Sequence, residues 1–302
     1  MKIAVAGASG LIGSALLPAL RADGHDVVQL VRRTPRTAEE HRWDPQHRRI
    51  DAALLRDVDA VINLGGTPIR PRPFTAGYKE RLRSSRLDVT TTISEALAVA
   101  AEADPGRSRV LLSASAVGYY GDTGSRTVTE RDGAGTDFLA RLCVEWEAAT
   151  APAESAGVRV VHLRTGLVLG HGAMLVKVLG TLTKLGLGGR MGSGRQYWPW
   201  ISVDDEVGAM RHLLTADVSG PVNLTGPAPA TNAEFTRELA RQLHRRAVIP
   251  VPAFAINLAL GEFGRSSVTA GQRAIPVRLE ESGYRFTHRD LTSALRAALG
   301  RS

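Results

Sequence analysis

The sequence predicts an α/β fold, in which helices cover both faces of a doubly wound parallel sheet and a smaller, mostly helical region follows. Short apolar runs of about five residues, rich in β-branched side chains, recur through the first half of the chain between turn-forming residues. Because these runs lack polar alternation, they are typical of strands buried on both faces. Longer helical patterns separate them, and this alternation favours a parallel sheet.

The elements can be placed in order along the chain. Strands are predicted at residues 2–6, 26–31, 60–64, 109–113, 159–163 and 222–224. Helices are predicted at residues 11–21, 90–103, 137–155 and 291–299, and residues 34–51 are expected to form an irregular loop. A further helix reaching residue 243 is expected to begin in a capping box, because Thr231 and Glu234 have the required types and spacing.

A glycine-rich turn, AGASGLIG at residues 6–13, joins the first predicted strand to the first predicted helix. Gly7 suits a tight turn, Gly10 lets a pyrophosphate approach the backbone, and Gly13 lets the helix pack closely on the sheet. Ser9 can add a hydroxyl donor, and the amides of Leu11 and Ile12 at the helix start can bind a phosphate. In this strand–turn–helix context the motif predicts a dinucleotide-binding Rossmann domain.

The end of the second strand predicts which dinucleotide binds. A site for NAD usually has an acidic residue there, which accepts a hydrogen bond from the 2′-hydroxyl of the adenosine ribose. This chain has Arg32 and Arg33 instead, and two guanidinium groups suit the 2′-phosphate of NADP. We therefore expect NADP(H) to be preferred over NAD(H), although two surface arginines without this role are the alternative.

The chain has 302 residues, which suggests one large domain with a smaller part. After Gly166 the sequence becomes rich in glycine and leucine and contains fewer strand patterns. We expect an NADP-binding Rossmann domain at residues 1–169, with a return segment at about 200–225. A substrate-side region is expected at residues 170–199 and 226–302.

Composition narrows the classes of partner and the cell compartment. Cys143 is the one cysteine, so no intrachain disulfide and no cysteine-rich zinc site is expected, and no metal is predicted. No apolar run approaches the roughly 20 residues of a membrane span, and the N-terminal apolar run ends in the glycines of the turn. We therefore expect a cytoplasmic protein that does not bind membranes.

The net charge of +8 does not by itself indicate a nucleic-acid partner. Arginine supplies 34 of the 38 lysine and arginine residues, and these are scattered along the chain. No nucleic-acid recognition motif accompanies them. We expect no nucleic-acid partner.

Several motifs match a known superfamily in the same order along the chain. They are the glycine turn, DAVINLGG (59–66), LLSASAVGYYGD (111–122), VVHLRTGLVLG (160–170) and WPWISVDDEVGA (198–209). With these motifs the chain resembles the extended short-chain dehydrogenase/reductases of the nucleotide-sugar epimerase type. RLRSSRLDVTTTI (81–93), VNLTGPAPATNAEF (222–235) and PVPAFAINLALGE (250–262) narrow the resemblance to the atypical SDR39U1-like epimerase family proteins. That subgroup has a C-terminal DUF1731 region, expected here at about 249–299.

The resemblance implies further cofactor contacts. Leu64, Gly65 and Gly66 would border the adenosine ribose. Ser113 and Ala114 would belong to the segment that carries the family's catalytic serine, and Arg164 and Thr165 to the strand that reaches the nicotinamide.

The superfamily's acid–base pair, a tyrosine followed four residues later by a lysine, is missing. None of the five tyrosines has a lysine at that spacing, and Phe138 and Leu142 occupy the expected positions. Ser115, with Ser113 as the weaker alternative, matches the third catalytic position, where it would donate a hydrogen bond to a substrate carbonyl. A strand-end serine that only caps backbone groups is the alternative role. Tyr119 or Tyr120 is a weaker candidate for the missing acid, with packing as the alternative role.

Other side chains have both a functional and a structural interpretation. Glu145 and Glu147 are candidates for the missing acid, although carboxylates of this kind usually face solvent. His162 is expected in the core, and Asp204 and Asp205 are expected to cap the next helix. An aromatic cluster with a neighbouring arginine is expected to line a substrate pocket or to plug the core: Arg195, Tyr197, Trp198 and Trp200.

Two functions remain open on the sequence. The first is an NADP-dependent oxidoreductase or epimerase-like enzyme that transfers a hydride to or from an unidentified small molecule. The second is a non-catalytic NADP-binding sensor or partner-binding protein on the same fold. By analogy with the superfamily, a homodimer through helices 90–103 and 137–155 is expected.

Overall fold

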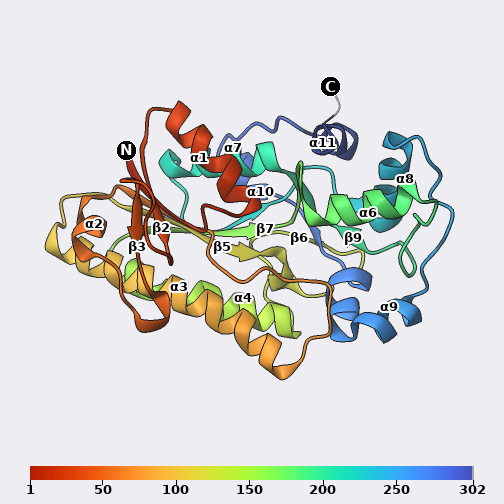
Figure 1. The fold of residues 1–302 in the computed structure, drawn as a ribbon, viewed down its shortest axis with the longest axis horizontal. Coiled ribbons are helices and arrows are strands. Elements are labelled where there is room, and N and C mark those ends of the chain that lie inside the picture. The colour runs from red at the N-terminus through yellow and green to blue at the C-terminus, as the bar shows by residue number, and fades with distance from the viewer. Residues whose placement is uncertain (301–302) are drawn as a thin grey trace.

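The computed structural model describes residues 1–300 and confirms the predicted fold class (Figure 1). A sheet of seven parallel strands has the order β11-β7-β5-β4-β1-β2-β3. Its strands are β1 (Lys2–Ala6), β2 (Asp26–Val31), β3 (Glu40–Arg42), β4 (Ala60–Asn63), β5 (Val110–Ala116), β7 (Arg159–Thr165) and β11 (Gly220–Leu224).

Helices cover both faces of this sheet (Figure 1). α1 (Leu11–Ala22) and α7 (Val203–Thr215) lie on one face, and α2 (Ala52–Asp57), α3 (Ala76–Ala103) and α5 (Ala151–Ser155) pack on the other. Successive residues of β1 point to opposite faces, yet all are buried or nearly so. This explains why the strands contain unbroken apolar runs.

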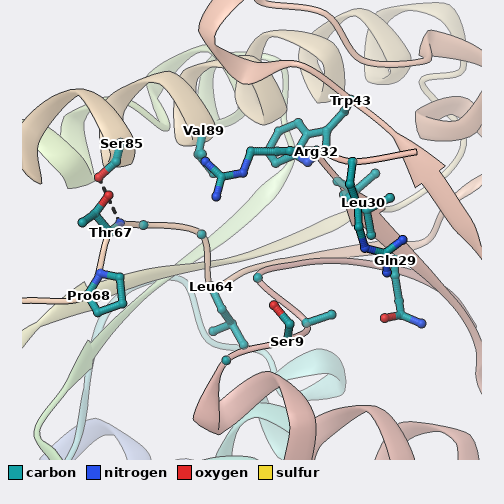
Figure 2. Close-up of a pocket in the computed structure, with 17 residues that line it drawn as sticks. Ser9, Gln29, Leu30, Arg32, Trp43, Leu64, Thr67, Pro68, Ser85 and Val89 are labelled. Carbon is teal, nitrogen blue, oxygen red and sulfur yellow. Dashed lines mark hydrogen bonds between the residues drawn. The ribbon is translucent and has the colours of Figure 1, made fainter. Parts of the chain in front are cut away.

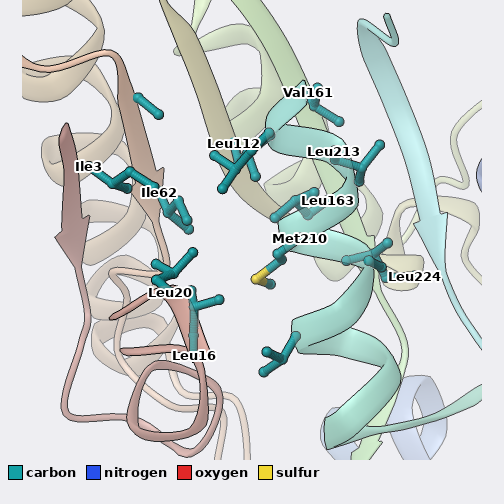
Figure 3. Packing of buried hydrophobic residues seen from close by; sticks show 14 of the residues in the cluster. Ile3, Leu16, Leu20, Ile62, Leu112, Val161, Leu163, Met210, Leu213 and Leu224 are labelled. Atoms are coloured by element: carbon teal, nitrogen blue, oxygen red, sulfur yellow. The ribbon is translucent and has the colours of Figure 1, made fainter. Parts of the chain in front are cut away.

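The core between the sheet and α1 and α7 is continuous (Figure 3). Leu16 and Leu20 of α1 and Met210 and Leu213 of α7 face the sheet, where Leu163 is one of their fully buried partners. This packing holds the carboxyl ends of the central strands in place.

The structure contains further helices, short strands and helical turns. The helices are α4 (Phe138–Ala148), α6 (Met174–Lys184), α8 (Asn232–Gln242), α9 (Ala253–Leu260), α10 (Val277–Glu281) and α11 (Leu291–Ala298). The short strands are β6 (Thr127–Val128), β8 (Leu167–Leu169), β9 (Tyr197–Trp198), β10 (Trp200–Ser202), β12 (Ala230–Thr231) and β13 (Arg273–Ala274). The other helical segments are the 3₁₀ turns η1 (Pro45–His47) and η2 (Val117–Tyr120) and the π-helical segment η3 (Gly264–Thr269).

Three predicted segments differ from the structure. The helix predicted at residues 90–103 is longer in the structure, where it begins 14 residues earlier. Its first turns were not predicted, because buried Arg86 interrupts the apolar pattern of the inward face. The helix predicted at residues 137–155 is divided into α4 and α5, since Pro152 lacks an N–H and favours a new first turn. The segment predicted as an irregular loop, residues 34–51, contains the polar edge strand β3 and the turn η1.

Two absences hold for residues 1–300. No helix there combines the length and the apolar character that a membrane crossing requires. Nor do three or more His, Cys, Asp or Glu side chains in that range gather in a way that could hold a metal ion. The predicted division into two domains stays a prediction.

Candidate functional site

A cavity of about 600 Å³ opens at the carboxyl ends of β1, β2 and β4 (Figure 2). β1 lies between β2 and β4, and the chain builds the sheet outward from it in both directions. This is the topological switch point, where open α/β sheets bind ligands. The lining residues are Gly7, Ala8, Ser9, Gly10, Gln29, Leu30, Val31, Arg32, Arg33, Trp43, Leu64, Gly65, Gly66, Thr67, Pro68, Ser85 and Val89.

The glycine turn forms one wall of the cavity. Gly7 has a φ of +81°, and a Cβ atom on it would lie 2.6 Å from the Leu64 carbonyl oxygen. A Cβ atom on Gly13 would lie 2.5 Å from the carbonyl oxygen of Gly7, so this glycine allows α1 to pack against the turn. Gly10, the residue before α1, leaves the helix start without a side-chain cap, and no acidic residue lies in the first turn. The free backbone N–H groups at this end suit an anion.

The two arginines predicted to bind the cofactor both line the cavity, but they differ in their partners. Arg33 forms a fork with Glu40, with Nη1–Oε2 at 2.7 Å and Nη2–Oε1 at 2.5 Å. The Arg33 guanidinium and the backbone N–H of Arg36 lower the pKa of Glu40 to about 2. Within residues 1–300, no hydrogen bond or ion pair engages the guanidinium of Arg32, which extends over the cavity beside Trp43 (Figure 2). Arg32 therefore supplies the cavity with an uncompensated positive charge.

The loop after β4 forms the opposite wall. The Asn63 side chain accepts a hydrogen bond from Gly65 N at 3.0 Å, and Ser85 Oγ accepts one from Thr67 N at 3.0 Å (Figure 2). A Cβ atom on Gly65 would lie 2.7 Å from a methyl carbon of Val89. These contacts hold the loop against α3 and keep its backbone open to the cavity.

Sequence reasoning missed several lining residues. They are Ala8, Gln29, Leu30, Val31, Trp43, Thr67, Pro68, Ser85 and Val89. Those at the end of β2 follow from the strand assignment, because carboxyl ends of parallel strands share one edge. Ser85 and Val89 were missed because the predicted helix started after them.

Seven of the predicted cofactor-binding residues do not line this cavity. They are Leu11, Ile12, Gly13, Ser113, Ala114, Arg164 and Thr165. The Ser113 hydroxyl is buried without a partner, and Thr165 donates to Glu206 Oε1 at 2.8 Å. Burial raises the pKa of Glu206 to about 8. The direct roles of these residues toward a cofactor stay predictions.

A second polar cluster lies at the carboxyl ends of β5 and β7. Ser115 Oγ donates to Glu147 Oε1 at 2.6 Å, and Arg164 donates to both oxygens of Glu147 at 2.8 and 2.9 Å. All three side chains are buried or nearly so. Burial disfavours the Arg164 cation, but the hydrogen bonds and charge of Glu147 outweigh that effect and raise the pKa of Arg164.

Both candidate tyrosines touch Arg164. The guanidinium carbon lies 3.4 Å from the ring centroid of Tyr119, and Nη1 donates to the Tyr120 hydroxyl at 3.0 Å. Tyr120 in turn donates to Asn223 at 2.8 Å. Burial raises the pKa of Tyr120 to about 12, so this phenol is a poor acid near neutral pH.

The positions of the missing tyrosine and lysine are apolar. Phe138 and Leu142 belong to a hydrophobic cluster with Phe74, Tyr78 and Leu82. Neither of the two side chains can carry a proton. One face of α4 therefore packs against α3 instead of presenting an acid–base pair.

The structure separates the other carboxylate and histidine candidates. Glu145 is exposed and pairs with Arg83, whereas Glu147, expected to face solvent, is nearly buried because it lies over β5 and β7. His162 is nearly buried and lies 2.9 Å from Thr150 Oγ1. Its burial agrees with the expected core position.

The predicted cap of α7 needs a correction. The capping side chain is that of Ser202, which accepts a hydrogen bond from Asp205 N at 2.9 Å. Asp204 and Asp205 lie in the first helical turn, since the chain enters α7 directly from β10. Asp205 is fully buried and accepts hydrogen bonds from the backbone N–H groups of Thr287 and His288.

The aromatic cluster lies away from the cavity. Trp198 and Trp200 are buried in a hydrophobic cluster with Phe235, and Trp200 Nε1 donates to a backbone carbonyl at 3.0 Å. Tyr197 is partly exposed beneath Arg273, and Arg195 is exposed. The tryptophans therefore plug the core, and the substrate role of the four residues stays a prediction.

Comparisons with known proteins agree with this architecture. The family model "NAD dependent epimerase/dehydratase family" matches residues 3–225, and the model "Domain of unknown function (DUF1731)" matches residues 251–298. An epimerase family protein of Mycobacterium tuberculosis is 48% identical over 294 residues, covering 97% of this chain and 96% of that protein. The human epimerase family protein SDR39U1 is 35% identical over 301 residues, covering 98% and 99%.

A solved structure extends the similarity to three dimensions. The crystal structure of human SDR39U1 (isoform 2) with NADPH superposes with a TM-score of 0.86 at 31% identity, and 99% of each chain is covered. The glycine turn, the parallel sheet and the DUF1731 match all occur in one chain. The chain therefore belongs to the NAD dependent epimerase/dehydratase family, among the epimerase family proteins of the SDR39U1 type.

Proposed function

We propose that the cavity binds NADP(H), and that the protein uses it in an oxidoreductase or epimerase-like reaction on a small molecule. The observation that carries this proposal is the uncompensated guanidinium of Arg32 at the end of β2. A 2′-phosphate there forms a hydrogen-bonded ion pair with this guanidinium, which a neutral 2′-hydroxyl cannot form. The NADPH in the structure of human SDR39U1 supports the same assignment.

The residues present fit this cofactor. Gly7 and Gly10 leave room where side chains would obstruct a pyrophosphate, and the uncapped start of α1 offers N–H groups to it. The loop of Leu64, Gly65 and Gly66 gives the adenosine ribose an open backbone wall. When bound, the nicotinamide supplies or accepts the hydride; the protein supplies binding, orientation and proton transfer.

The roles of the two arginines can be separated by experiment. We expect Arg32→Ala to weaken NADPH binding by about 10- to 100-fold and to leave NADH binding nearly unchanged, because one charge-assisted contact is lost. Arg33→Ala is the matched control, since Glu40 already engages that guanidinium. Its effect on NADPH should be several-fold smaller. Quenching of tryptophan fluorescence during titration provides the measurement, because Trp43 lines the cavity.

The outcome decides between phosphate recognition and general binding. Equal affinity of the wild type for NADPH and NADH would contradict the NADP preference. A wild type that binds neither dinucleotide would contradict the proposed function itself.

One observation supports a second function, that of a non-catalytic NADP-binding sensor. Phe138 and Leu142 replace the superfamily's proton-transferring pair. A protein that binds NADPH tightly, but whose bound NADPH reduces no carbonyl probe, would favour this sensor over an enzyme.

A further inference from the structure

In this structure the Ser115 hydroxyl donates its hydrogen bond to Glu147. The two hydrogen bonds from Arg164 hold the Glu147 carboxylate in its ionised form, which can only accept. Ser115 therefore donates to Glu147, and the serine oxygen is left to accept a hydrogen bond. This differs from the expectation that Ser115 donates to a substrate carbonyl, and it favours a substrate that presents a hydroxyl group.

Ser115 lies near the carboxyl end of β5, at the edge of the sheet onto which the cavity opens. β5 pairs with β4 so that Ser113 lies opposite Asn63, the last residue of β4, and Ser115 lies two residues further toward that edge. Glu147 reaches Ser115 from α4, four residues after Cys143, and that spacing places both side chains on the face of α4 that meets β5. The Glu147 carboxylate thus contacts the serine from the side of α4.

A route for a proton leads from Glu147 to the surface. Its Oε2 atom lies 4.0 Å from His162 Nδ1, a gap that a small rotation of either side chain must close. The other ring nitrogen of His162, Nε2, lies 3.3 Å from Glu154 Oε1, and the Glu154 side chain is 47% exposed. A neutral imidazole can take a proton at one nitrogen and release one from the other.

Three other titratable or charged groups near Glu147 do not compete with His162 for this proton. They are Cys143 on α4, Arg164 on β7 and Tyr120 on η2. Burial raises the pKa of Cys143 to about 12 and that of Tyr120 to about 12, so both stay protonated near neutral pH. Burial lowers the pKa of His162, against the opposing charges of Glu147 and Glu154. Glu147 and His162 are thus the pair through which a proton can pass.

We propose that Ser115 and Glu147 form the proton-transfer pair of this protein, in place of the missing tyrosine and lysine, and that the substrate is an alcohol or its carbonyl product. This rests on the proposed NADP(H) function. In oxidation, the alcohol's proton moves to Ser115 Oγ while the serine's own proton moves to Glu147 Oε1. The C–H electron pair leaves with its hydrogen as a hydride to the oxidised nicotinamide dinucleotide, and the C=O bond forms. Carbonyl reduction is the reverse.

The first test needs no turnover. The carboxylate stretch of Glu147, followed by infrared difference spectroscopy, reports the hydrogen bonds that its oxygens accept. Glu147→Gln, which removes the band, assigns it. We expect the band to shift in Ser115→Ala, because the serine O–H that donates to Oε1 is gone. An unshifted band would overturn the coupling between the two side chains.

The second test measures proton transfer with 9,10-phenanthrenequinone as the carbonyl probe and bound NADPH in single turnovers. Ser115→Ala and Glu147→Gln should each slow reduction by about 100-fold or more, the range of general acid catalysis, at unchanged NADPH affinity. Ser115→Ala keeps the Glu147–Arg164 pair, so it remains informative if Glu147→Gln does not fold.

The matched control is Glu145→Gln, an exposed glutamate on the same helix, which should keep the wild-type rate. A wild-type rate in Glu147→Gln would overturn the proposal, as would a wild type that binds NADPH and leaves the quinone untouched. Failure of the wild type to bind NADPH would instead contradict the proposed function. The two failures are therefore distinguishable.

Discussion

At the scale of single residues, the glycine turn was the part of the site most accessible to sequence reasoning. Gly7 and Gly13 meet backbone atoms that leave no room for a side chain, so their identity follows from local geometry. The sequence could not predict that Arg33 is paired and Arg32 is not, because the partner Glu40 lies on a strand that was not predicted. The same holds for Glu147, whose partners come from β5 and β7.

A side chain at Gly7 would cause a steric clash, and its effect on stability can be measured separately from that of backbone strain. Gly7 and Gly24 have almost the same φ, +81° and +79°, but a Cβ on Gly24 meets nothing within 4 Å. Gly24→Ala should lower the free energy of unfolding by about 1 kcal/mol through strain. Gly7→Ala should lower it by roughly 1–3 kcal/mol more, and it should weaken NADPH binding. Urea unfolding of both variants checks this, and equal losses would argue against the clash.

At the scale of elements, the strands and the capping box were predictable, and several helix boundaries were not. The capping box of Thr231 and Glu234 depends on neighbouring residues alone, and the structure confirms it. The first turns of α3 were not predicted, because Arg86 places a polar residue on the inward face of the helix. In the structure this arginine donates hydrogen bonds to backbone carbonyls such as that of Thr67. Tertiary packing thus sets helix boundaries that the periodicity of the sequence does not show.

The first turn of α7 predicts a pH effect on stability. Fully buried Glu206 has its pKa raised from 4.5 to about 8, so the folded protein holds a proton that the unfolded chain has lost between these values. Stability should therefore decrease as pH rises from about 4.5 to about 8 and level off above. In Glu206→Gln this contribution, on the order of a few kcal/mol, should be absent.

Urea unfolding at pH 5 and pH 8.5 provides the measurement for Glu206. The free energy of unfolding of Glu206→Gln should fall less across this interval than that of the wild type. Glu102→Gln, at an exposed position of α3, serves as the control and should behave like the wild type. A parallel pH dependence in Glu206→Gln and the wild type would contradict the assignment.

At the scale of the whole molecule, the alternation of strands and helices predicted a parallel sheet, but the order of its strands came from the structure. The glycine turn after the first strand still predicted a dinucleotide site at the end of β1, where the cavity lies. The burial of Trp198 and Trp200 could not be predicted, because aromatic side chains next to glycines suit a pocket wall and a core equally well. Their burial beside Phe235 depends on how α8 packs.

The core between α7 and the sheet should dominate global stability. Leu213 is fully buried there, and Leu213→Ala should lower the free energy of unfolding by about 2–5 kcal/mol. Leu258 on α9 is 86% exposed, and Leu258→Ala should change it by less than about 0.5 kcal/mol. Urea unfolding followed by tryptophan fluorescence measures both. Similar losses in the two variants would contradict the assigned core.

The most direct test of the account is a crystal structure of this protein with NADPH. The account predicts the pyrophosphate on the glycine turn, the 2′-phosphate within hydrogen-bond distance of the Arg32 guanidinium, and the nicotinamide directed toward the edge of the sheet where Ser115 lies near the end of β5. A dinucleotide bound outside the cavity, or a 2′-phosphate without contact to Arg32, would contradict it.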